Sequence, residues 1–230
     1  MVLGAIINAA AILVGGSVGL LFKGRVSEKI SVTTTRAIGL CVCIIGISGA
    51  LDGDIMLLVV SLMFGALIGE FIDIDARLKT LGLFLQKKLA YSDSKPVFAE
   101  GFVTATLLFC VGAMAVVGSI EAGLRDDYSI IVTKSIIDAT AAMVFASTLG
   151  FGVLFSAFAV LIYQGIIEFF AGFLQGVLTA ELITQISAVG GLMILALGVN
   201  MVVGPRIKVA NLLPGLLFAV VYYFFLLNAF

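Results

Sequence analysis

Residues 3–29 read LGAIINAAAILVGGSVGLLFKGRVSEK, and this stretch decides the fold, because twenty residues without a charge lead directly into a basic gap. A helix of about twenty residues is about 30 Å long and spans the hydrocarbon core of a bilayer. Backbone groups cannot stay unpaired in hydrocarbon, so such a run must form a helix. The basic residues follow the apolar run, unlike those of a signal peptide. The stretch therefore predicts a retained first transmembrane helix.

The composition of the whole chain favours the same class of protein. Its 230 residues are 62% hydrophobic and 12% charged, with a mean hydropathy of +1.25, whereas soluble domains carry about 25% charged residues. The net charge of −1 excludes the basic footprint of a nucleic-acid-binding protein. The chain contains no His, the commonest ligand of zinc and haem, so we expect neither a metal site nor a cofactor. The expected partner is the lipid bilayer.

Further apolar runs of similar length predict an all-α, polytopic transmembrane bundle of about eight spans, forming one integral domain over residues 1–230. The predicted spans are 3–22, 36–52, 55–72, 98–120, 130–149, 151–171, 183–203 and 209–228. Eleven of the thirteen Lys and Arg residues fall in the gaps after the first, third and seventh spans. Basic gaps stay in the cytoplasm, so both termini are expected outside it.

Two gaps need a separate interpretation. The gap near 149–152 should be cytoplasmic but carries no charge. Either Gly150 and Gly152 form a tight turn, or residues 130–171 form a pair of half-helices that re-enters without crossing. In the long gap, apolar residues recur at helical spacing from Ile74 to Leu89. They predict an amphipathic helix over 74–89 that lies on the cytoplasmic membrane surface.

Ionisable and amide side chains inside the apolar runs are the candidates for function, because charges in a membrane are costly and usually face a partner or a pathway. Lys134 and Asp138 are four residues apart in one span, and Gln164 and Glu168 are four apart in the next. Counted from the outer ends of antiparallel helices, Lys134 matches Glu168 in depth and Asp138 matches Gln164. These pairs either hold two helices in register or leave Asp138 facing a solvated substrate or ion path. Other polar residues that could line the path are Asn8, Ser119, Ser147 and Asn200.

Small residues repeat in two ways. Spacings such as Gly15-x-x-x-Gly19 and Gly65-x-x-x-Gly69 let helices approach closely, in a compact bundle or in a homodimer. In addition, Ala37-Ile-Gly39 precedes Gly46 much as Ala188-Val-Gly190 precedes Gly198. Five helices separate the two copies, which would therefore be inverted, as in many secondary transporters. Chance explains this short, Gly-rich match equally well.

Several segments resemble one known family. They are Gly65-Ala-Leu-Ile-Gly-Glu70, Phe109-Cys-Val-Gly-Ala-Met-Ala-Val-Val-Gly-Ser119, Lys134-Ser-Ile-Ile-Asp138, Phe145-Ala-Ser-Thr-Leu-Gly150 and Val209-Ala-Asn-Leu-Leu-Pro214. Together they are similar to the domain of unknown function 554 family of YqgA-like bacterial inner-membrane proteins. The resemblance spans nearly the whole chain and implies a small protein of the bacterial cytoplasmic membrane, often guessed to be a transporter.

Two hypotheses about function remain. In the first, the chain is a small secondary transporter or channel for a small solute or ion, in which Asp138 binds a proton or cation and Lys134 binds an anionic group. In the second, it is a scaffold or accessory subunit whose buried polar groups only specify helix packing. An enzyme is not expected, because the sequence contains no nucleophile elbow, no Glu-x-x-His pair and no phosphate-binding loop.

Overall fold

The computed structural model describes residues 2–23, 28–88, 97–174, 176 and 178–227. These residues form helices and no strand, so the predicted all-helical, polytopic fold is confirmed. The residue contacts divide the chain into two compact units. Unit 1 comprises Met1–Ser31 and Lys79–Val177, and unit 2 comprises Val32–Leu78 and Leu178–Phe230. The single domain over 1–230 stays a prediction, and each unit is described by itself.

Fewer helices than the predicted eight spans have the length and hydropathy of a complete span. Within the described ranges, six helices are long and apolar enough to cross a membrane, or up to seven if one bent pair forms a single span. The six are Leu3–Phe22, Val32–Ala50, Ile55–Ile72, Ser129–Leu149, Gly152–Phe169 and Ala180–Val203. The predicted spans 98–120 and 209–228 are the two that fall short. The first is broken, and the second is a shorter composite helix over Val209–Phe225.

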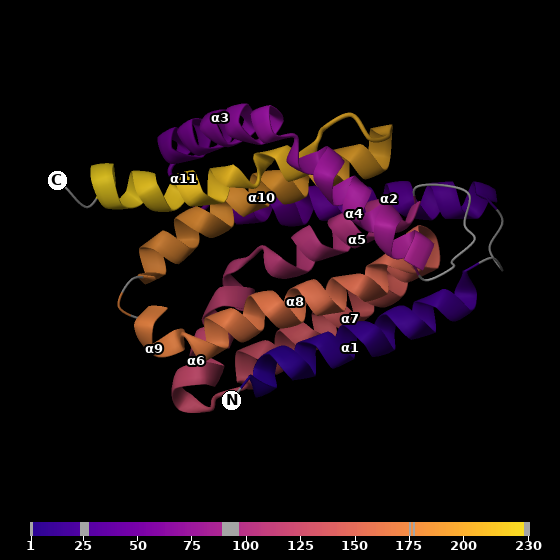
Figure 1. Cartoon of the computed structure of the whole chain (residues 1–230), viewed down its shortest axis with the longest axis horizontal. Helices are drawn as coiled ribbons and strands as arrows, with labels where there is room; N and C mark the ends of the chain where they lie inside the picture. The colour runs from indigo at the N-terminus through magenta and orange to yellow at the C-terminus, as the bar shows by residue number, and fades with distance from the viewer. Residues whose placement is uncertain (1, 24–27, 89–96, 175, 177, 228–230) are drawn as a thin grey trace. The chain divides into compact units, whose positions relative to one another are not determined.

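Unit 1 is built around the first helix of the chain. Its elements are α1 (Leu3–Phe22), α5 (Val97–Cys110), α6 (Ala113–Arg125), α7 (Ser129–Leu149), α8 (Gly152–Phe169) and the short α9 (Ala171–Leu174). Helix α1 lies along α7 and α8 (Figure 1). The α1–α7 contact is close because a Cβ atom at Gly15 or Gly19 would overlap the backbone of Ala139 or Met143. The predicted small-residue spacing in α1 therefore marks a helix contact within the chain.

The predicted span 98–120 is interrupted in its middle. Helix α5 ends at Cys110, α6 begins at Ala113, and the two helices meet at an angle of 61° (Figure 1). Gly112 lies at the break with φ 134° and ψ 148°, a conformation that only glycine adopts without strain. Hydropathy did not reveal the break, because the residues on both sides of it are apolar.

The uncharged gap between α7 and α8 is a tight turn. Gly150 has φ +77°, and α7 and α8 are each long and apolar enough to cross a membrane alone. The re-entrant alternative for 130–171 is therefore not supported. A Cβ atom at Gly150 would collide with the side chain of Lys23 at the end of α1. The turn thus lies beside a basic residue, although it carries none itself.

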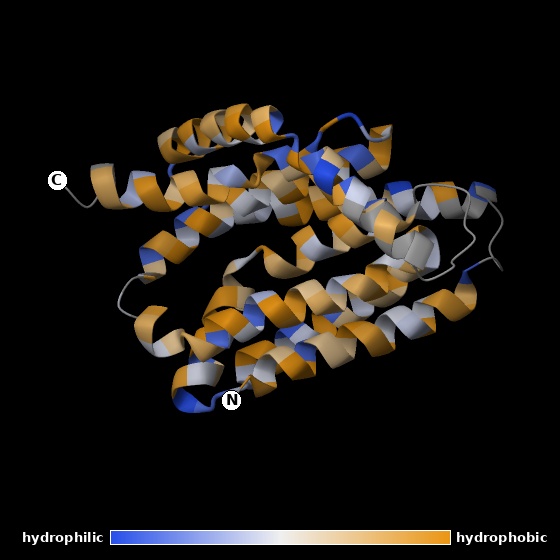
Figure 2. Ribbon diagram, viewed as in Figure 1, coloured by the Kyte–Doolittle hydropathy of each residue, from blue (hydrophilic) through white to orange (hydrophobic). Residues whose placement is uncertain are grey.

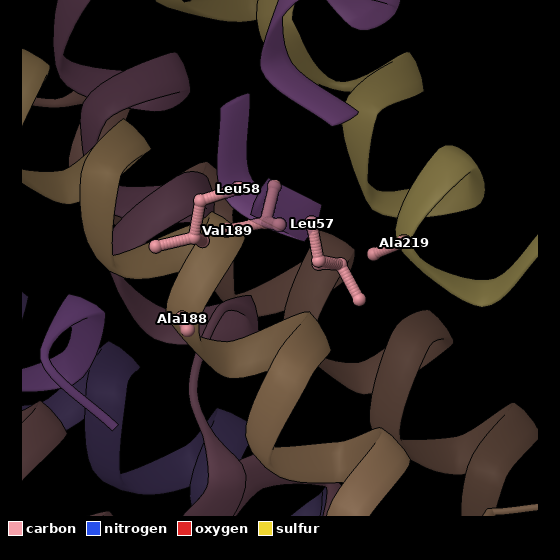
Figure 3. Packing of buried hydrophobic residues seen from close by; sticks show 5 residues of the cluster. All are labelled: Leu57, Leu58, Ala188, Val189 and Ala219. Carbon is pink, nitrogen blue, oxygen red and sulfur yellow. The ribbon is translucent and has the colours of Figure 1, made fainter. Parts of the chain in front are cut away.

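Unit 2 contains α2 (Glu28–Ala50) from Val32 onward, α3 (Ile55–Ile72), α10 (Ala180–Val203), the 3₁₀ turn η1 (Val209–Leu212), α11 (Pro214–Tyr222) and the π-helical turn η2 (Tyr223–Leu227). Its apolar core joins α3, α10 and α11 through Leu57, Leu58, Ala188, Val189 and Ala219 (Figure 3).

Helices α2 and α10 run antiparallel and touch through glycines. A Cβ atom at Gly39 would lie 3.0 Å from the carbonyl oxygen of Gly198, and one at Gly46 would lie 2.7 Å from that of Gly191. These helices carry the two copies of the suspected inverted repeat. Their pairing is what a local two-fold relation requires, and the repeat itself stays a prediction.

Helix α4 (Ile74–Lys88) follows α3 directly after Asp73, which has φ +52°. It agrees with the predicted helix over 74–89, except that Leu89 lies outside the described residues. Its position on the membrane surface stays a prediction. Figure 2 shows hydrophilic residues at the start of α4, in the turn after α6 and in the loop after α10.

Large apolar side chains cover the outer faces of several helices. Phe71 is 93% exposed, Leu51 is 77% exposed and Leu67 is 62% exposed. Exposing these side chains to water would be unfavourable, because removing apolar surface from water stabilises a protein by about 25 cal/mol per Å². Lipid chains are the solvent that fits them.

Candidate functional site

Two oppositely charged side chains meet inside unit 1. Lys134 and Asp138 lie one turn apart on α7, and the Lys134 Nζ atom donates to Asp138 Oδ2. Each side chain is only 8% exposed. A charge in such surroundings is stable only when it is paired and hydrogen-bonded. Among the described residues, the only other buried charged side chain is Glu168.

Asn8 of α1 connects this ion pair to α8. Its Nδ2 atom donates to Asp138 Oδ2 at 2.9 Å and to Gln164 Oε1 at 2.9 Å. A carboxylate only accepts hydrogen bonds, so the amide group that faces Asp138 must be the NH₂ of Asn8. The charge of Asp138 thereby fixes the orientation of the Asn8 carboxamide, which in turn fixes that of Gln164.

The two amides each keep one atom without a partner. Asn8 Oδ1 and Gln164 Nε2 are buried and make no hydrogen bond, and both residues are 0% exposed. An unpaired buried polar group costs about 1–3 kcal/mol. A free acceptor and a free donor therefore lie next to a buried ion pair.

Glu168 of α8 has a different partner from the predicted one. Its carboxylate accepts from the backbone N–H of Gly4 at 3.0 Å and from that of Ala5 at 2.9 Å. It therefore caps the N-terminus of α1, where Val2 offers no side-chain cap, and a negative charge is favourable there.

The predicted contact between Lys134 and Glu168 is thus wrong for this structure, and the predicted contact between Asp138 and Gln164 is bridged by Asn8. The physical reason is that α1 packs against both α7 and α8. Its backbone takes Glu168, and its Asn8 side chain takes the position between Asp138 and Gln164. Lys134, left without a carboxylate on α8, binds the one on its own helix.

The helix break lies beside the helix that carries the ion pair. Both halves of the broken helix, α5 and α6, contact α7. Gly112, the residue before α6, has no side chain to cap the first N–H groups of that helix. Unwound backbone and half-helix ends beside buried charges are typical of the binding sites of secondary transporters.

The remaining predicted site residues lie elsewhere. Ser119 Oγ donates to the Ala115 carbonyl of its own helix, and Ser147 Oγ donates to that of Val144. Asn200 belongs to unit 2, where its Oδ1 accepts from Arg206 N–H and Ile207 N–H and its Nδ2 donates to the Ile207 carbonyl. Asn200 therefore holds the loop after α10. The structure brings together Asn8, Lys134, Asp138 and Gln164, with Glu168 one turn away.

Unit 2 has a polar cluster of its own at the end of α3. Glu70 accepts from Lys208 Nζ and from Asn211 Nδ2. The Glu70 carboxylate raises the pKa of the exposed Lys208 ammonium above its usual value. Asn211 Oδ1 accepts from the Asp75 N–H at 2.7 Å. The cluster therefore joins the starts of α4 and η1 to α3, which is a structural role.

The family model described as "Protein of unknown function (DUF554)" matches residues 3–224 of the chain. The chain belongs to this family. This DUF554 member is 33% identical over 219 residues to the "Uncharacterized membrane protein YdfK" of Bacillus subtilis (strain 168), which covers 93% of the chain and 92% of that protein. It is 34% identical over 223 residues to the "Uncharacterized protein YqgA" of Escherichia coli (strain K12), and this match covers 95% of the chain and 95% of that protein. No solved structure matches it. The predicted resemblance to YqgA-like proteins is confirmed.

Proposed function

We propose that this DUF554 protein is a small secondary transporter or channel for a small solute or ion, and that its site lies where α1, α7 and α8 meet in unit 1. One observation carries the proposal: Asn8 Oδ1 and Gln164 Nε2 are buried without partners beside the Lys134–Asp138 pair. A fully satisfied polar network would leave neither atom without a partner.

The break between α5 and α6 supports the same function. Both halves of the broken helix contact α7, the helix that carries Lys134 and Asp138. Irregular backbone at membrane depth is tolerated where it is buried in protein or lines a cavity. A hinge at Gly112 would let one half-helix move while the other stays packed, as alternating access requires.

The proposed setting is the cytoplasmic membrane of a bacterium, with both termini outside. Contacts within unit 1 support this orientation. Lys23, the Gly150 turn and the start of α5 at Phe98 lie at one end, because Gly150 touches Lys23 and Gly152 touches Phe98. The N-terminus of α1 lies at the other end with Glu168. The basic residue marks the first end as cytoplasmic.

The test is charge movement in proteoliposomes on a solid-supported membrane. Wild type, Asp138→Asn and Asp52→Asn are each challenged with jumps of pH, NaCl, KCl and amino acids. Asp52→Asn is the matched control, because Asp52 is exposed and lies outside the unit 1 cluster, which comprises Asn8, Lys134, Asp138, Gln164 and Glu168. We expect currents from wild type and from Asp52→Asn that Asp138→Asn lacks. Equal currents from all three folded proteins would remove Asp138 from the transport path, and silence from all three would favour the scaffold.

A further inference from the structure

The charges buried in unit 1 do not balance. Lys134, Asp138 and Glu168 are the charged side chains that are buried in the described part of the chain. They comprise one ammonium against two carboxylates, so one negative charge is in excess. The N-terminus of α1, with about half a positive charge, offsets part of this excess at Glu168. The charge that the cluster lacks is therefore a single positive one, and an anion would increase the imbalance.

We propose that the cluster binds one monovalent cation, a proton or Na⁺, at Asp138 in exchange for the Lys134 ammonium. The inference rests on the proposed function and names the ligand of its site. Lys134 occupies Asp138 Oδ2, so an arriving cation and the lysine compete for one carboxylate. A monovalent cation matches the single charge of Asp138, and a carboxylate together with an amide oxygen is a suitable set of ligands for H⁺ or Na⁺.

Glu168 provides a second partner for the displaced lysine. A Cβ atom at Gly4 would lie 3.1 Å from Glu168 Oε2 and 3.3 Å from Ile131 Cγ2, so Glu168 and the α7 residue about one turn before Lys134 lie beside the same glycine. The flexible lysine side chain can swing from Asp138 toward Glu168. The ammonium then stays paired while Asp138 holds the cation, and all three buried charges are neutralised.

The two amides complete the exchange. Asn8 presents its NH₂ group to the charged carboxylate. If the Asn8 carboxamide rotates by half a turn, Oδ1 faces Asp138 and can accept from a protonated carboxyl or ligate Na⁺. Rotation of Gln164 keeps the hydrogen bond between the two amides, now with Nε2 as the donor. The two atoms without partners, Asn8 Oδ1 and Gln164 Nε2, are the atoms that the cation-bound state uses.

The titratable groups around Asp138 are few. Lys134 lies on the same helix, α5 ends at Cys110 and contacts α7, and α8 contributes Glu168, one turn from Gln164. Helix α1 contributes only the neutral Asn8. Replacing these residues one at a time therefore identifies which of them takes up or releases a proton.

Binding is measured on the purified protein in detergent, without transport. Wild type is titrated with NaCl against choline chloride at constant ionic strength and several pH values, while thermal unfolding and proton release are followed. Infrared difference spectra on acidification report a protonated carboxyl group. Na⁺-dependent stabilisation identifies Na⁺ as the ligand, whereas a carboxyl band without any Na⁺ effect identifies the proton. Either signal must disappear in Asp138→Asn and persist in Asp52→Asn.

Lys134→Met tests the exchange itself. Removal of the competing ammonium should raise the cation affinity about tenfold or more, because a neighbouring opposite charge changes the proton affinity of a carboxyl group by about one to three pH units. Glu168→Gln removes the second partner of the lysine and should lower the cation affinity. It provides the test if Lys134→Met does not fold.

An unchanged cation affinity in the folded variants overturns the exchange, and identical H⁺ and Na⁺ binding by wild type and Asp138→Asn overturns the site. If Asp138 binds the cation but the proteoliposomes give no current, the proposed transport is contradicted and the cation site is not.

Discussion

At the scale of single residues, the stability of unit 1 depends on keeping the buried charges paired. Lys134→Met leaves the Asp138 carboxylate without its ammonium, which should cost about 3–5 kcal/mol near neutral pH and without Na⁺. Lys134→Met combined with Asp138→Asn should cost less than the single change, because no charge is left unpaired. Denaturant unfolding in mixed micelles measures the cycle. Strictly additive losses would show that the two side chains do not stabilise each other.

The same residues show what depth along the helices could predict. Counting from the span ends placed Lys134, Asp138, Gln164 and Glu168 in one region, and the structure brings them there. This counting could not identify which of these side chains bind one another. The helix that contacts both α7 and α8 is α1, more than a hundred residues away in sequence, and local spacing holds no information about it. Asn8 was selected only as an isolated polar residue in an apolar run.

At the scale of elements, the α1–α7 contact depends on two glycines. Gly15→Ala would place a methyl group on the Ala139 backbone, and overpacking of this kind costs about 1–3 kcal/mol. Gly172→Ala is the matched control, because its methyl group would meet only Leu124 Cδ2 at 4.0 Å. We expect a lower melting temperature for Gly15→Ala and little change for the control. Equal melting temperatures would mean that α1 and α7 pack less closely.

The break between α5 and α6 depends on backbone conformation and not on space. A Cβ atom at Gly112 would have no neighbour within 4 Å, but φ is +134°, so Gly112→Ala should cost about 1–3 kcal/mol through strain. Gly165→Ala in α8 has nearest contacts of 3.8 Å and ordinary helical backbone, so it should be neutral or stabilise by up to about 1 kcal/mol. Thermal unfolding of both variants separates the two effects. A neutral Gly112→Ala would contradict the broken geometry.

The sequence predicted helices well where hydropathy alone defines them. Residues 3–22 and 55–72 match α1 and α3 at both ends; Lys23 follows the first run, and Asp54 and Asp73 flank the second. The sequence did not reveal the break inside 98–120, since a hydropathy window counts apolar side chains and does not register one glycine with unusual φ. Nor did the sequence reveal the division within 209–228, where Pro214 begins α11 after a 3₁₀ turn.

At the scale of the whole molecule, the distribution of basic residues predicts which ends of the helices face the cytoplasm. In a protein whose Cys41, Cys43 and Cys110 are replaced by Ser, Leu51→Cys and Arg125→Cys should react with a membrane-impermeant maleimide in intact cells. Ile207→Cys should react only after the membrane is permeabilised, because it lies between Arg206 and Lys208. Leu51 and Ile207 are exposed in the structure. The reverse labelling pattern would invert the proposed orientation.

The bonds from α1 to α7 and α8 have a consequence for the synthesis of the protein. The two partners of Asn8 lie 130 and 156 residues further along the chain, and Glu168, which caps α1, lies 163 and 164 residues beyond the groups that it binds. At about 5–20 residues per second, a ribosome needs several seconds or more to reach them. Until then α1 lies in the translocation machinery or in the lipid. Its Asn8 amide has none of its later partners, and the N–H groups of Gly4 and Ala5 are uncapped. The polar cluster is therefore among the last parts of unit 1 to assemble, and a chain that stops short of α8 leaves its first helix unfinished.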